Sequence, residues 1–512
     1  MKKILTIIIL LFTAAISCNK NNNTTGSIGK VGEITINPLK NTPLSAVYIT
    51  ETVNSNPITV TVKGQHGEAD LVHTYPAGYG TEFPIHGMYP NIENTITVND
   101  GGRIIEQKHN PGTITMYRGY QLKERYEPVK AYDSSVKENY PNNPDMFFVG
   151  VLASQTDATA WEGLIAVSKN GYVRYVNTAI NYISRFAVDN NRFILYNMEG
   201  NEGIYDFFGQ RILTTKNHMH HELVKKGDNY IYLANSDLGW EDSLIEMDAS
   251  GNIVNELYFG DVLRKAVGTA NESELSKIVF DYKTPYNGNT KIDWFHANAC
   301  VYDSSSDILY VSSRHRGVLA IKYTSWELLW WMADDTLKVD TGTAYSQIPY
   351  DVQFKDVTSL AKYRVGGAAV NDGPRNQHAL LLYQNGKIAM FDNRDEGGLP
   401  PNMTVGESRY VEYQITQDSS GNWTALKTDE YKNGEYSKMV SDIDLTGDNN
   451  ENLLITYGSF QAKIFELNKT SKAVLYQLNL PFLTYRTEKM PLYYEQGRKY
   501  PEDSNLKQPL IQ

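Results

Sequence analysis

The sequence predicts an all-β protein, a six-bladed β-propeller preceded by a small N-terminal β-sandwich. Three observations predict it: short alternating apolar runs broken by Pro, Gly, Asn or Asp, a strand-turn-strand unit that recurs along the second part of the chain, and 36 Tyr and 38 Gly among 512 residues. Tyr suits a half-buried pleated surface and Gly suits tight turns, so this composition favours many short strands. The 41% of apolar residues supplies a large core and excludes a mainly disordered chain.

The first 17 residues are predicted to be a signal peptide of the lipoprotein type, with a lipid carried by Cys18. Lys2 and Lys3 precede an uncharged apolar run from Ile4 to Ile16, which is too short to span a membrane comfortably. Residues 18–30 form a flexible tether rich in Asn, Thr, Gly and Ser. We therefore expect a periplasmic chain that is anchored to a membrane leaflet only through the lipid on Cys18. The alternative is an ordinary secretory signal in which Cys18 is incidental.

The net charge and the cysteine count bear on two properties of the protein: whether it binds nucleic acid and whether it can form a disulfide. The net charge is −11 and no block of Lys and Arg occurs, so a nucleic-acid partner is not expected. Cys18 and Cys300 are the only cysteines. If Cys18 carries lipid, Cys300 has no partner within the chain, and the mature protein has no internal disulfide although it works in an oxidising space. Its stability must then come from a large core.

The front part, residues 31–126, is predicted to be a small antiparallel sandwich. Its runs alternate between apolar and polar residues, which is the period of a half-buried strand, and no helical period of useful length intervenes. A polar linker with several Pro residues follows over residues 127–144. The alternating runs begin at Glu33, Ala46, Ile58, Thr95 and Thr113.

Residues 145–512 contain a repeated unit, and this repeat predicts the propeller. Each copy is a meander of strands that cannot bury both of its faces alone, so radial stacking of about six copies is the arrangement that hides them. The spacing is irregular because of insertions such as Asp261 to Asn289. Clear copies begin at Arg185, His221, His296, His378 and Ser441, and the stretch from Phe147 to Val167 supplies one more.

Three histidines, His221, His296 and His378, share one position of this repeat, at the start of the run that precedes the turn. Equivalent positions of successive blades are related by rotation about the propeller axis, so three imidazoles are expected to converge at one mouth of the central channel. His220 precedes His221 directly. Because adjacent residues of a strand face opposite sides, the register favours His221 over His220.

Two chemistries fit such a ring of imidazoles. Three His ligands and a water form a common zinc site, although the sequence contains no HExxH or CxxC motif. The other chemistry is group transfer through a histidine, in which cations and amides hold the transferred oxyanion. It requires an amide and a cation nearby: Asn298 lies two residues after His296 on the same side of the strand, and Arg314 lies on the next strand of that blade. No Walker loop and no GxGxxG after a strand is found, so no nucleotide cofactor is expected.

These segments resemble the bacterial arylsulfate sulfotransferases that work without the nucleotide sulfate donor. Asp293-Trp-Phe-His296-Ala-Asn298 and Ser312-Ser-Arg314-His315 look like that family's central motif. His220-His221-Glu222-Leu223 resembles its His-His-acid-aliphatic motif, and Asn376-Gln377-His378-Ala379 resembles its later His motif. In the front part, Val31 to Pro38 and Gly87-Met-Tyr-Pro90 look like the family's amino-terminal sandwich. The likeness covers nearly the whole mature chain.

The resemblance implies a propeller enzyme that transfers a sulfuryl group from a phenolic sulfate ester to a phenolic acceptor. His378 falls where the family has its nucleophile, so a transient sulfohistidine and ping-pong kinetics are expected, with no metal and no other cofactor. His221 or His220, together with His296, Asn298 and Arg314, matches the remaining catalytic positions. Related enzymes suggest a homodimer. This chain cannot form the disulfide that many family members carry, and we expect that departure to affect stability rather than chemistry.

Two other functions compete with this one. A lipid-anchored propeller that only binds a ligand or a protein partner would keep the fold without the catalysis, because a fold alone does not guarantee activity. A metal-dependent hydrolase built on the three histidines is the third hypothesis. An assay with a chromogenic aryl sulfate, with and without a phenol and a chelator, separates the three.

Overall fold

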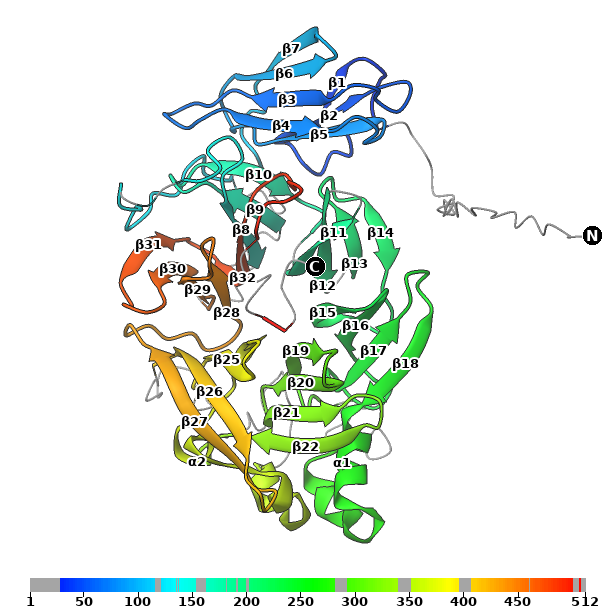
Figure 1. Cartoon of the computed structure of the whole chain (residues 1–512), viewed down its shortest axis with the longest axis vertical. Helices are drawn as coiled ribbons and strands as arrows, with labels where there is room; N and C mark the ends of the chain where they lie inside the picture. The colour runs from blue at the N-terminus through cyan, green and yellow to red at the C-terminus, as the bar shows by residue number, and fades with distance from the viewer. Residues whose placement is uncertain are drawn as a thin grey trace, which may run out of the picture.

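The computed structural model describes residues 28–115, 121–134, 136, 138–152, 163–180, 182–189, 192–198, 202–280, 292–338, 351–395, 407–459, 461–500 and 506–507. Within these ranges the strands form eight sheets, two in an N-terminal unit and six arranged around a common centre (Figure 1). The predicted fold class is therefore confirmed. The signal peptide at residues 1–17, the lipid site Cys18 and most of the tether lie outside the described residues. In the described part, no helix is both long enough and apolar enough to cross a membrane.

The N-terminal unit is a sandwich of one three-stranded and one four-stranded sheet. Its alternating sequence decides which side chains face the core: in Ile58–Val62 the Ile and both Val are buried, while the two Thr between them are half-buried. Of the run predicted to begin at Thr113, the described residues 113–115 contain one isolated bridge, between Thr115 and Gln121, and the rest of the run lies outside the described residues. The sheets have the orders β1 (Ile34–Ile36), β2 (Ser45–Ile49), β5 (Glu82–His86) and β4 (Leu71–Tyr75), β3 (Ile58–Val62), β6 (Asn94–Asp100), β7 (Arg103–His109).

Six antiparallel sheets follow, one for each blade, and in each blade the strands are ordered from the axis outward. Blade 1 is β32 (Leu483–Met490), β8 (Met146–Leu152), β9 (Gly163–Val167) and β10 (Val173–Asn177), and blade 2 is β11 (Tyr182–Asp189), β12 (Arg192–Met198), β13 (Gly203–Asp206) and β14 (Arg211–Thr214). Blade 3 is β15 (His220–Lys226), β16 (Asn229–Ala234), β17 (Ser243–Met247) and β18 (Ile253–Tyr258), and blade 4 is β19 (Ala297–Asp303), β20 (Ile308–Ser313), β21 (Gly317–Lys322) and β22 (Glu327–Met332). Blade 5 is β24 (His378–Leu382), β25 (Lys387–Asp392), β26 (Arg409–Gln417) and β27 (Trp423–Tyr431) with the parallel β23 (Val365–Gly367), and blade 6 is β28 (Asp442–Thr446), β29 (Asn452–Tyr457), β30 (Lys463–Asn468) and β31 (Val474–Asn479).

The last strand of the propeller completes its first blade. β32 pairs with β8, from Met490 opposite Met146 to Leu483 opposite Leu152. This pairing joins the two ends of the repeat and removes the open edges that an unclosed ring would leave. The inner strands β32, β11, β15, β19, β24 and β28 each contact the next, and β28 contacts β32, so they enclose the centre of the ring.

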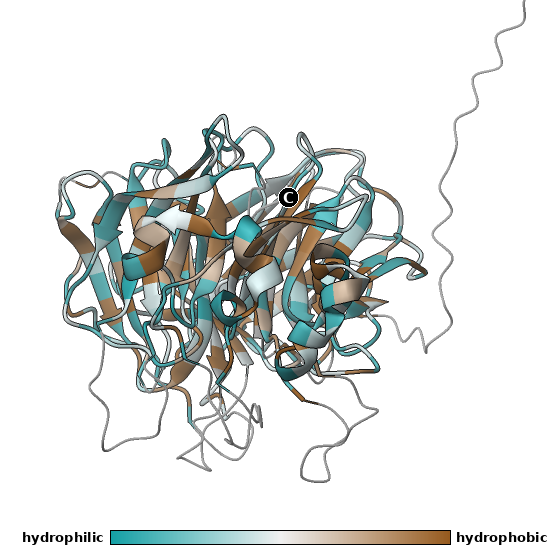
Figure 2. Cartoon of the chain, turned by 90° about the horizontal axis from the view of Figure 1, so that it is seen from below, coloured by the Kyte–Doolittle hydropathy of each residue, from teal (hydrophilic) through white to brown (hydrophobic). Residues whose placement is uncertain are grey.

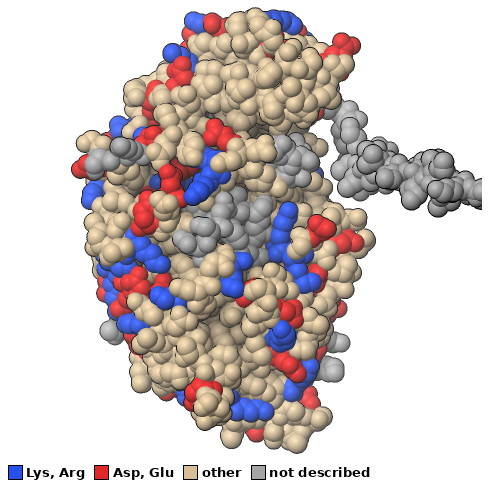
Figure 3. Space-filling view, viewed as in Figure 1, with Lys and Arg blue, Asp and Glu red and all other residues tan. Residues whose placement is uncertain are grey.

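Packing between blades supplies the core that the sequence predicts. Phe147 of blade 1 stacks on Tyr476 of blade 6 with ring centroids 4.7 Å apart, and apolar residues lie between the polar edges of the sheets (Figure 2). Cys300 is a buried free cysteine. Charged side chains of both signs are mixed on the face seen in Figure 3.

The insertions between blades contain short helices that the predicted all-β fold does not include. The described part of the predicted insertion from Asp261 to Asn289, residues 261–280, contains most of α1 (Phe259–Val267) and the 3-10 helix η2 (Thr269–Lys277). The segment before β24 holds η3 (Phe354–Asp356), η4 (Thr358–Tyr363) and α2 (Ala368–Asp372). Val262 and Leu263 of α1 are fully buried, which attaches this helix to the apolar core beside blades 3 and 4.

A bulge recurs where the inner strands begin. The pairing register shifts between His220 and Leu223 in blade 3, between Ala297 and Ala299 in blade 4, and between His378 and Leu380 in blade 5. His221, His296 and Ala379 take left-handed backbone angles there, with φ of 56°, 54° and 53°. A bulge interrupts the alternation of side chains and turns a residue towards a new direction. The bulge therefore reorients His221, which lies inside the shifted register, while His296 and His378 stand directly before the shift in their blades.

Candidate active site

The three histidines that share the repeat position meet at one end of the ring of inner strands. The ring of His221 lies 5.3 Å from that of His296 and 6.3 Å from that of His378, measured between ring centroids. They come from the beginnings of β15, β19 and β24, which are neighbouring inner strands. His221 and His378 are buried and His296 is half-buried. The structure thus brings together the imidazoles that the repeat register predicts to converge.

His378 is held as a neutral imidazole with a defined tautomer. Its Nδ1 lies 2.8 Å from Oδ1 of Asn393, and the Asn393 amide nitrogen donates to the carbonyls of Ser437 at 2.8 Å and Val440 at 3.1 Å. Because that nitrogen faces the two carbonyls, Oδ1 faces the ring, so Nδ1 carries the proton and Nε2 keeps its lone pair. Burial, then the charges of Arg314 and His221, hold the pKa of His378 well below its ordinary value.

His296 is the cationic member of the group. Its Nδ1 lies 2.6 Å from a carboxylate oxygen of Asp293 and 2.9 Å from one of Glu241. Burial alone would lower the pKa of His296, but these two carboxylates raise it to about 10. His296 is therefore an imidazolium throughout the neutral range. His315 also contacts Asp293, with its Nε2 3.5 Å from a carboxylate oxygen. Burial lowers the pKa of His315 to about 4.

His221, rather than His220, faces the other two histidines. Its Nδ1 lies 2.8 Å from the hydroxyl of Tyr485, and its Nε2 lies 3.3 Å from Glu241. The ring of His220 is 5.1 Å from that of His221 and nearly perpendicular to it. The bulge with positive φ at His221 produces this separation, so the two side chains differ for a reason more local than simple strand alternation.

Arg314 and Asn298 both reach the start of β24. The Arg314 backbone N–H donates to the His296 carbonyl at 2.9 Å, and its guanidinium lies 3.3 Å from Asp395. Asn298 donates from Nδ2 to the carbonyl of Gln377 at 2.7 Å, next to His378. That bond uses one of the two amide hydrogens of Asn298. Both predicted residues thus lie around His378, one as a cation and one as an amide.

Four further residues of the site were not predicted as site residues from the sequence. Asp293 could have been predicted, because it lies three residues before His296, a spacing at which its carboxylate can contact the imidazole ring. Glu241, Asn393 and Tyr485 carry no such signal, because Glu241 and Asn393 follow strands in turns and Tyr485 belongs to the strand that closes blade 1. Glu241 also has a strained left-handed backbone, with φ of 52°.

The zinc hypothesis needs ligand atoms that converge on one point. Among the described residues, His220, His221 and Glu241 form one group with that property, and Asp293, His296 and His315 form another. His378 belongs to neither group. The three histidines of the repeat position therefore do not make up a single ligand set, and hydrogen bonds to carboxylates and amides define their geometry instead.

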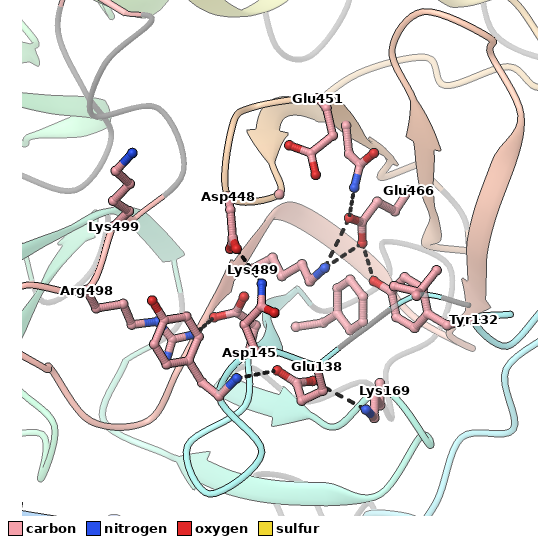
Figure 4. Close-up of a pocket in the computed structure, with 16 residues that line it drawn as sticks. Tyr132, Glu138, Asp145, Lys169, Asp448, Glu451, Glu466, Lys489, Arg498 and Lys499 are labelled. Atoms are coloured by element: carbon pink, nitrogen blue, oxygen red, sulfur yellow. Dashed lines mark hydrogen bonds and ion pairs between the residues drawn. The ribbon is translucent and has the colours of Figure 1, made fainter. Parts of the chain in front are cut away.

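A charged pocket of about 150 Å³ lies away from the histidines, between the linker and blades 1 and 6 (Figure 4). Its charges pair within the protein: Lys489 with Glu466 at 2.8 Å, Arg498 with Asp145 at 2.6 Å, and Lys169 with Glu138 at 3.3 Å. These pairs connect the linker and the segment after β32 to blade 1, and connect blade 1 to blade 6. The pocket contains no group placed for group transfer.

Comparison with known proteins follows the same division of the chain. The arylsulfotransferase (ASST) family model matches residues 134–493, and the arylsulfotransferase Ig-like domain model matches residues 33–108. The arylsulfate sulfotransferase AssT of Escherichia coli O6:H1 is 22% identical over 524 aligned positions, which cover 82% of this chain and 84% of that protein.

Two solved structures to which the chain is similar resemble it only distantly. A β-propeller domain of Cps50 (Swd1) from Myceliophteria thermophila has a TM-score of 0.32 at 8% identity and covers 69% of this chain and 90% of its own. A protein of unknown function from Bacteroides thetaiotaomicron has a TM-score of 0.30 at 10% identity and covers 85% of this chain and 94% of its own.

Proposed function

Since this chain belongs to the arylsulfotransferase family and is therefore a transferase, we propose that it moves a sulfuryl group from a phenolic sulfate ester to a phenolic acceptor through a covalent adduct on His378. The observation that carries this proposal is the neutral His378 ring, whose Nδ1 proton is directed to Asn393 and whose Nε2 is left as a lone pair. Such a nitrogen is the nucleophile that group transfer requires.

In the first half-reaction, Nε2 of His378 attacks sulfur in line with the bond to the phenolic oxygen. The N–S bond forms as the S–O bond breaks, and the electron pair of that bond leaves on the phenolic oxygen. Arg314 and the His296 imidazolium stabilise the charge on the equatorial sulfuryl oxygens, and Asn298 offers an amide hydrogen to the same group. Asn393 accepts a stronger hydrogen bond from Nδ1 as the His378 ring becomes positive.

His221 supplies and recovers the proton. Its contact with Glu241, at 3.3 Å, is longer than those that Glu241 and Asp293 make with His296, so a phenolic oxygen can take its place. In its protonated form His221 gives the Nε2 proton to the departing phenol. In the second half-reaction it takes a proton from the acceptor phenol, whose oxygen attacks sulfur while the N–S bond breaks and its electron pair returns to His378. No proton is consumed over the whole cycle.

The test is an assay with a chromogenic aryl sulfate on the purified full-length chain. We expect release of the chromophore that depends on an added phenol, appears as the sulfated acceptor in equal amount and persists in the presence of a chelator. Release without an acceptor that the chelator abolishes would support the hydrolase instead. Absence of turnover across a range of aryl esters would support the binding module.

We also propose that the chain acts in the periplasm, anchored through a lipid on Cys18. The signal-like residues 1–17 and the following tether support this location. Mass spectrometry of the N-terminal peptide should find acyl groups on Cys18, and a Cys18→Ser variant should be released from membranes. An unmodified Cys18 in a membrane fraction would exclude the anchor.

A further inference from the structure

Three carboxylates that sulfuryl transfer does not use lie buried inside the ring of inner strands. Asp442 and Asp444 belong to β28 and Glu488 belongs to β32, and these two strands contact each other beside the centre of the ring (Figure 1). The three side chains offer carboxylate oxygens that lie within 4.8 Å of one another. The residues are only 3%, 3% and 6% exposed. Asp and Glu are rarely buried to this degree unless they are paired.

The arginines around this group balance only part of its charge. Glu222 is a fourth buried carboxylate, and it pairs with Arg185 at 2.9 Å and with Arg486 at 3.3 Å. Arg486 also lies 3.4 Å from Asp442. When every group is ionised, four carboxylates against two guanidinium groups leave an excess of two negative charges. Buried charge of this kind is unfavourable unless protons or a cation offset it.

Two further oxygen atoms at this place accept no hydrogen bond from the protein. Oε1 of Glu488 is buried and has no hydrogen-bond partner in the described part of the chain. The same holds, within the described ranges, for the hydroxyl of Thr456, which is 1% exposed. Thr456 lies directly opposite Asp442 where β29 pairs with β28, so their side chains project from the same face of the sheet. Asp444, two residues after Asp442, shares that face, so carboxylate and hydroxyl oxygens converge here from two blades.

We propose that Asp442, Asp444 and Glu488 form a Ca²⁺ site, with the hydroxyl of Thr456 as a fourth protein ligand. Ca²⁺ prefers oxygen ligands and holds them at about 2.3–2.6 Å. Two oxygens on opposite sides of the ion are therefore about 4.6–5.2 Å apart, which accommodates carboxylates that lie within 4.8 Å of one another. One divalent cation also offsets the excess of two negative charges. Mg²⁺ fits less well, because it demands near-ideal octahedral geometry and retains several waters.

The ion would join the two ends of the propeller repeat. β28 belongs to blade 6, whereas β32 comes from the end of the repeat and completes blade 1. Because Ca²⁺ bound to both strands requires the closed ring, its binding free energy stabilises that ring against unfolding. In a chain freed of divalent cations, protons on the same carboxylates offset the charge instead. The role is structural, so the site does not depend on the proposed sulfuryl transfer and adds no metal to that reaction.

Calcium titration of the full-length chain tests the site. The protein is freed of divalent cations with a chelator, exchanged into metal-free buffer at neutral pH and titrated with CaCl₂ in a calorimeter. We expect one ion per chain with a Kd of about 10⁻⁶–10⁻⁴ M. In thermal unfolding, Tm should rise by about 2–5 °C in about 1 mM Ca²⁺, and by less in the same concentration of Mg²⁺.

Two variants and a matched control assign the ligands. Asp444→Asn and Glu488→Gln each remove one carboxylate, so each should weaken calcium binding by about tenfold or more and reduce the rise in Tm. In the presence of chelator, Glu488→Gln should unfold at or above the parental Tm, because it removes one of four crowded like charges. Asp448→Asn removes an exposed carboxylate from the turn between β28 and β29 and should bind Ca²⁺ like the parent chain.

Four results would overturn the site. The first is the absence of both a heat of binding and a change in Tm when Ca²⁺ is added to the parent chain. The second is a calcium effect that survives in both folded variants, which would place the ion elsewhere. Loss of the effect in Asp448→Asn would assign it to the exposed turn instead. A larger rise in Tm with Mg²⁺ than with Ca²⁺ would show that the choice of ion is wrong.

Discussion

The two halves of the channel are built from the same inner strands but carry different chemistry. At the strand beginnings lie His221, His296 and His378, whose rings are close to one another beside the register shifts of their blades. One residue further along β15, Glu222 pairs with Arg185 at 2.9 Å and with Arg486 at 3.3 Å. All of these ionic side chains are fully or almost fully buried.

The carboxylates outnumber the arginines in this second half. Asp442 lies 3.4 Å from Arg486, and ligand atoms of Asp442, Asp444 and Glu488 lie within 4.8 Å of one another. Burial raises the pKa of Asp442 to about 6, and burial together with the charge of Asp442 raises that of Glu488 to about 8. The histidine cluster thus holds groups in defined protonation states for transfer, while the buried carboxylate cluster holds protons because its charged forms are shielded from water.

The largest difference between the halves should appear when His378 is removed. His378→Ala should lower acceptor-dependent transfer by about 10³-fold or more, because no other neutral imidazole occupies that position. Glu488→Gln, from the other half, should retain activity within about twofold. If His378→Ala retains full transfer in the chromogenic assay, the assignment of catalysis to the histidine cluster is wrong.

A second effect should follow from the carboxylate that joins His221 to His296. Glu241→Gln removes one of the two carboxylates that raise the pKa of His296 to about 10, so this pKa should fall. We expect kcat/KM to drop by about 10- to 100-fold and the alkaline limb of its pH profile to move to lower pH. An alkaline limb at the parental position would show that His296 is not the group that titrates there.

The same charge pair affects stability with a definite sign. The folded pKa of His296 lies above the unfolded one, so its stabilisation is fully present below the unfolded pKa and is lost as pH rises through about 10. Urea unfolding of the parent chain and of Glu241→Gln across this range should therefore converge at high pH. A difference that stays constant with pH would point to packing rather than charge.

A smaller effect is expected from the amide that orients His378. Asn393→Ala removes the acceptor for the Nδ1 proton and should lower kcat by about tenfold with little change in KM, since the ring loses its fixed tautomer but substrate contacts remain. Asn393→Asp is the matched variant: its carboxylate should raise the pKa of His378 and move the acid limb of the pH profile upward. An unchanged acid limb in Asn393→Asp would contradict this role.

The smallest effect concerns the closed half and should appear only in stability. A carboxyl whose folded pKa is raised loses stability as pH rises above its unfolded pKa and up to the folded one, which for Glu488 runs from about 4 to about 8. Glu488→Gln should therefore unfold like the parent at about pH 4 and be more stable by about 1–3 kcal/mol near pH 9. If the parent and Glu488→Gln have equal urea midpoints at both pH values, Glu488 is not the group that holds a proton in the folded state.

Much of the fold could be predicted because repetition is visible in a sequence. The shared register of His221, His296 and His378 predicted that these rings meet, and the structure brings them together. Asn298, predicted to face the same side as His296, contacts the residue before His378. The short helices α1 and α2 were not predicted, since they fill irregular insertions between blades.

The electrostatic partners could not be predicted, because the turns that carry them have no fixed place in the repeat. Glu241 and Asn393 reach the histidines only after the blades have closed around the axis. The register favoured His221 over His220, and the structure places His221 beside the other two histidines, but its orientation comes from a left-handed bulge that alternation of residues does not reveal. Asp442 and Glu488 occupy regular strand positions, and only the ring brings their carboxylates together.

The most direct test is the mass of the chain after reaction with donor alone. The protein is incubated with an aryl sulfate in the absence of any phenol, quenched at alkaline pH and digested. We predict one sulfuryl increment on the peptide that contains His378, which disappears when an acceptor phenol is added and is absent in His378→Ala. An increment on another residue, or none while transfer still proceeds, would contradict the covalent route through His378.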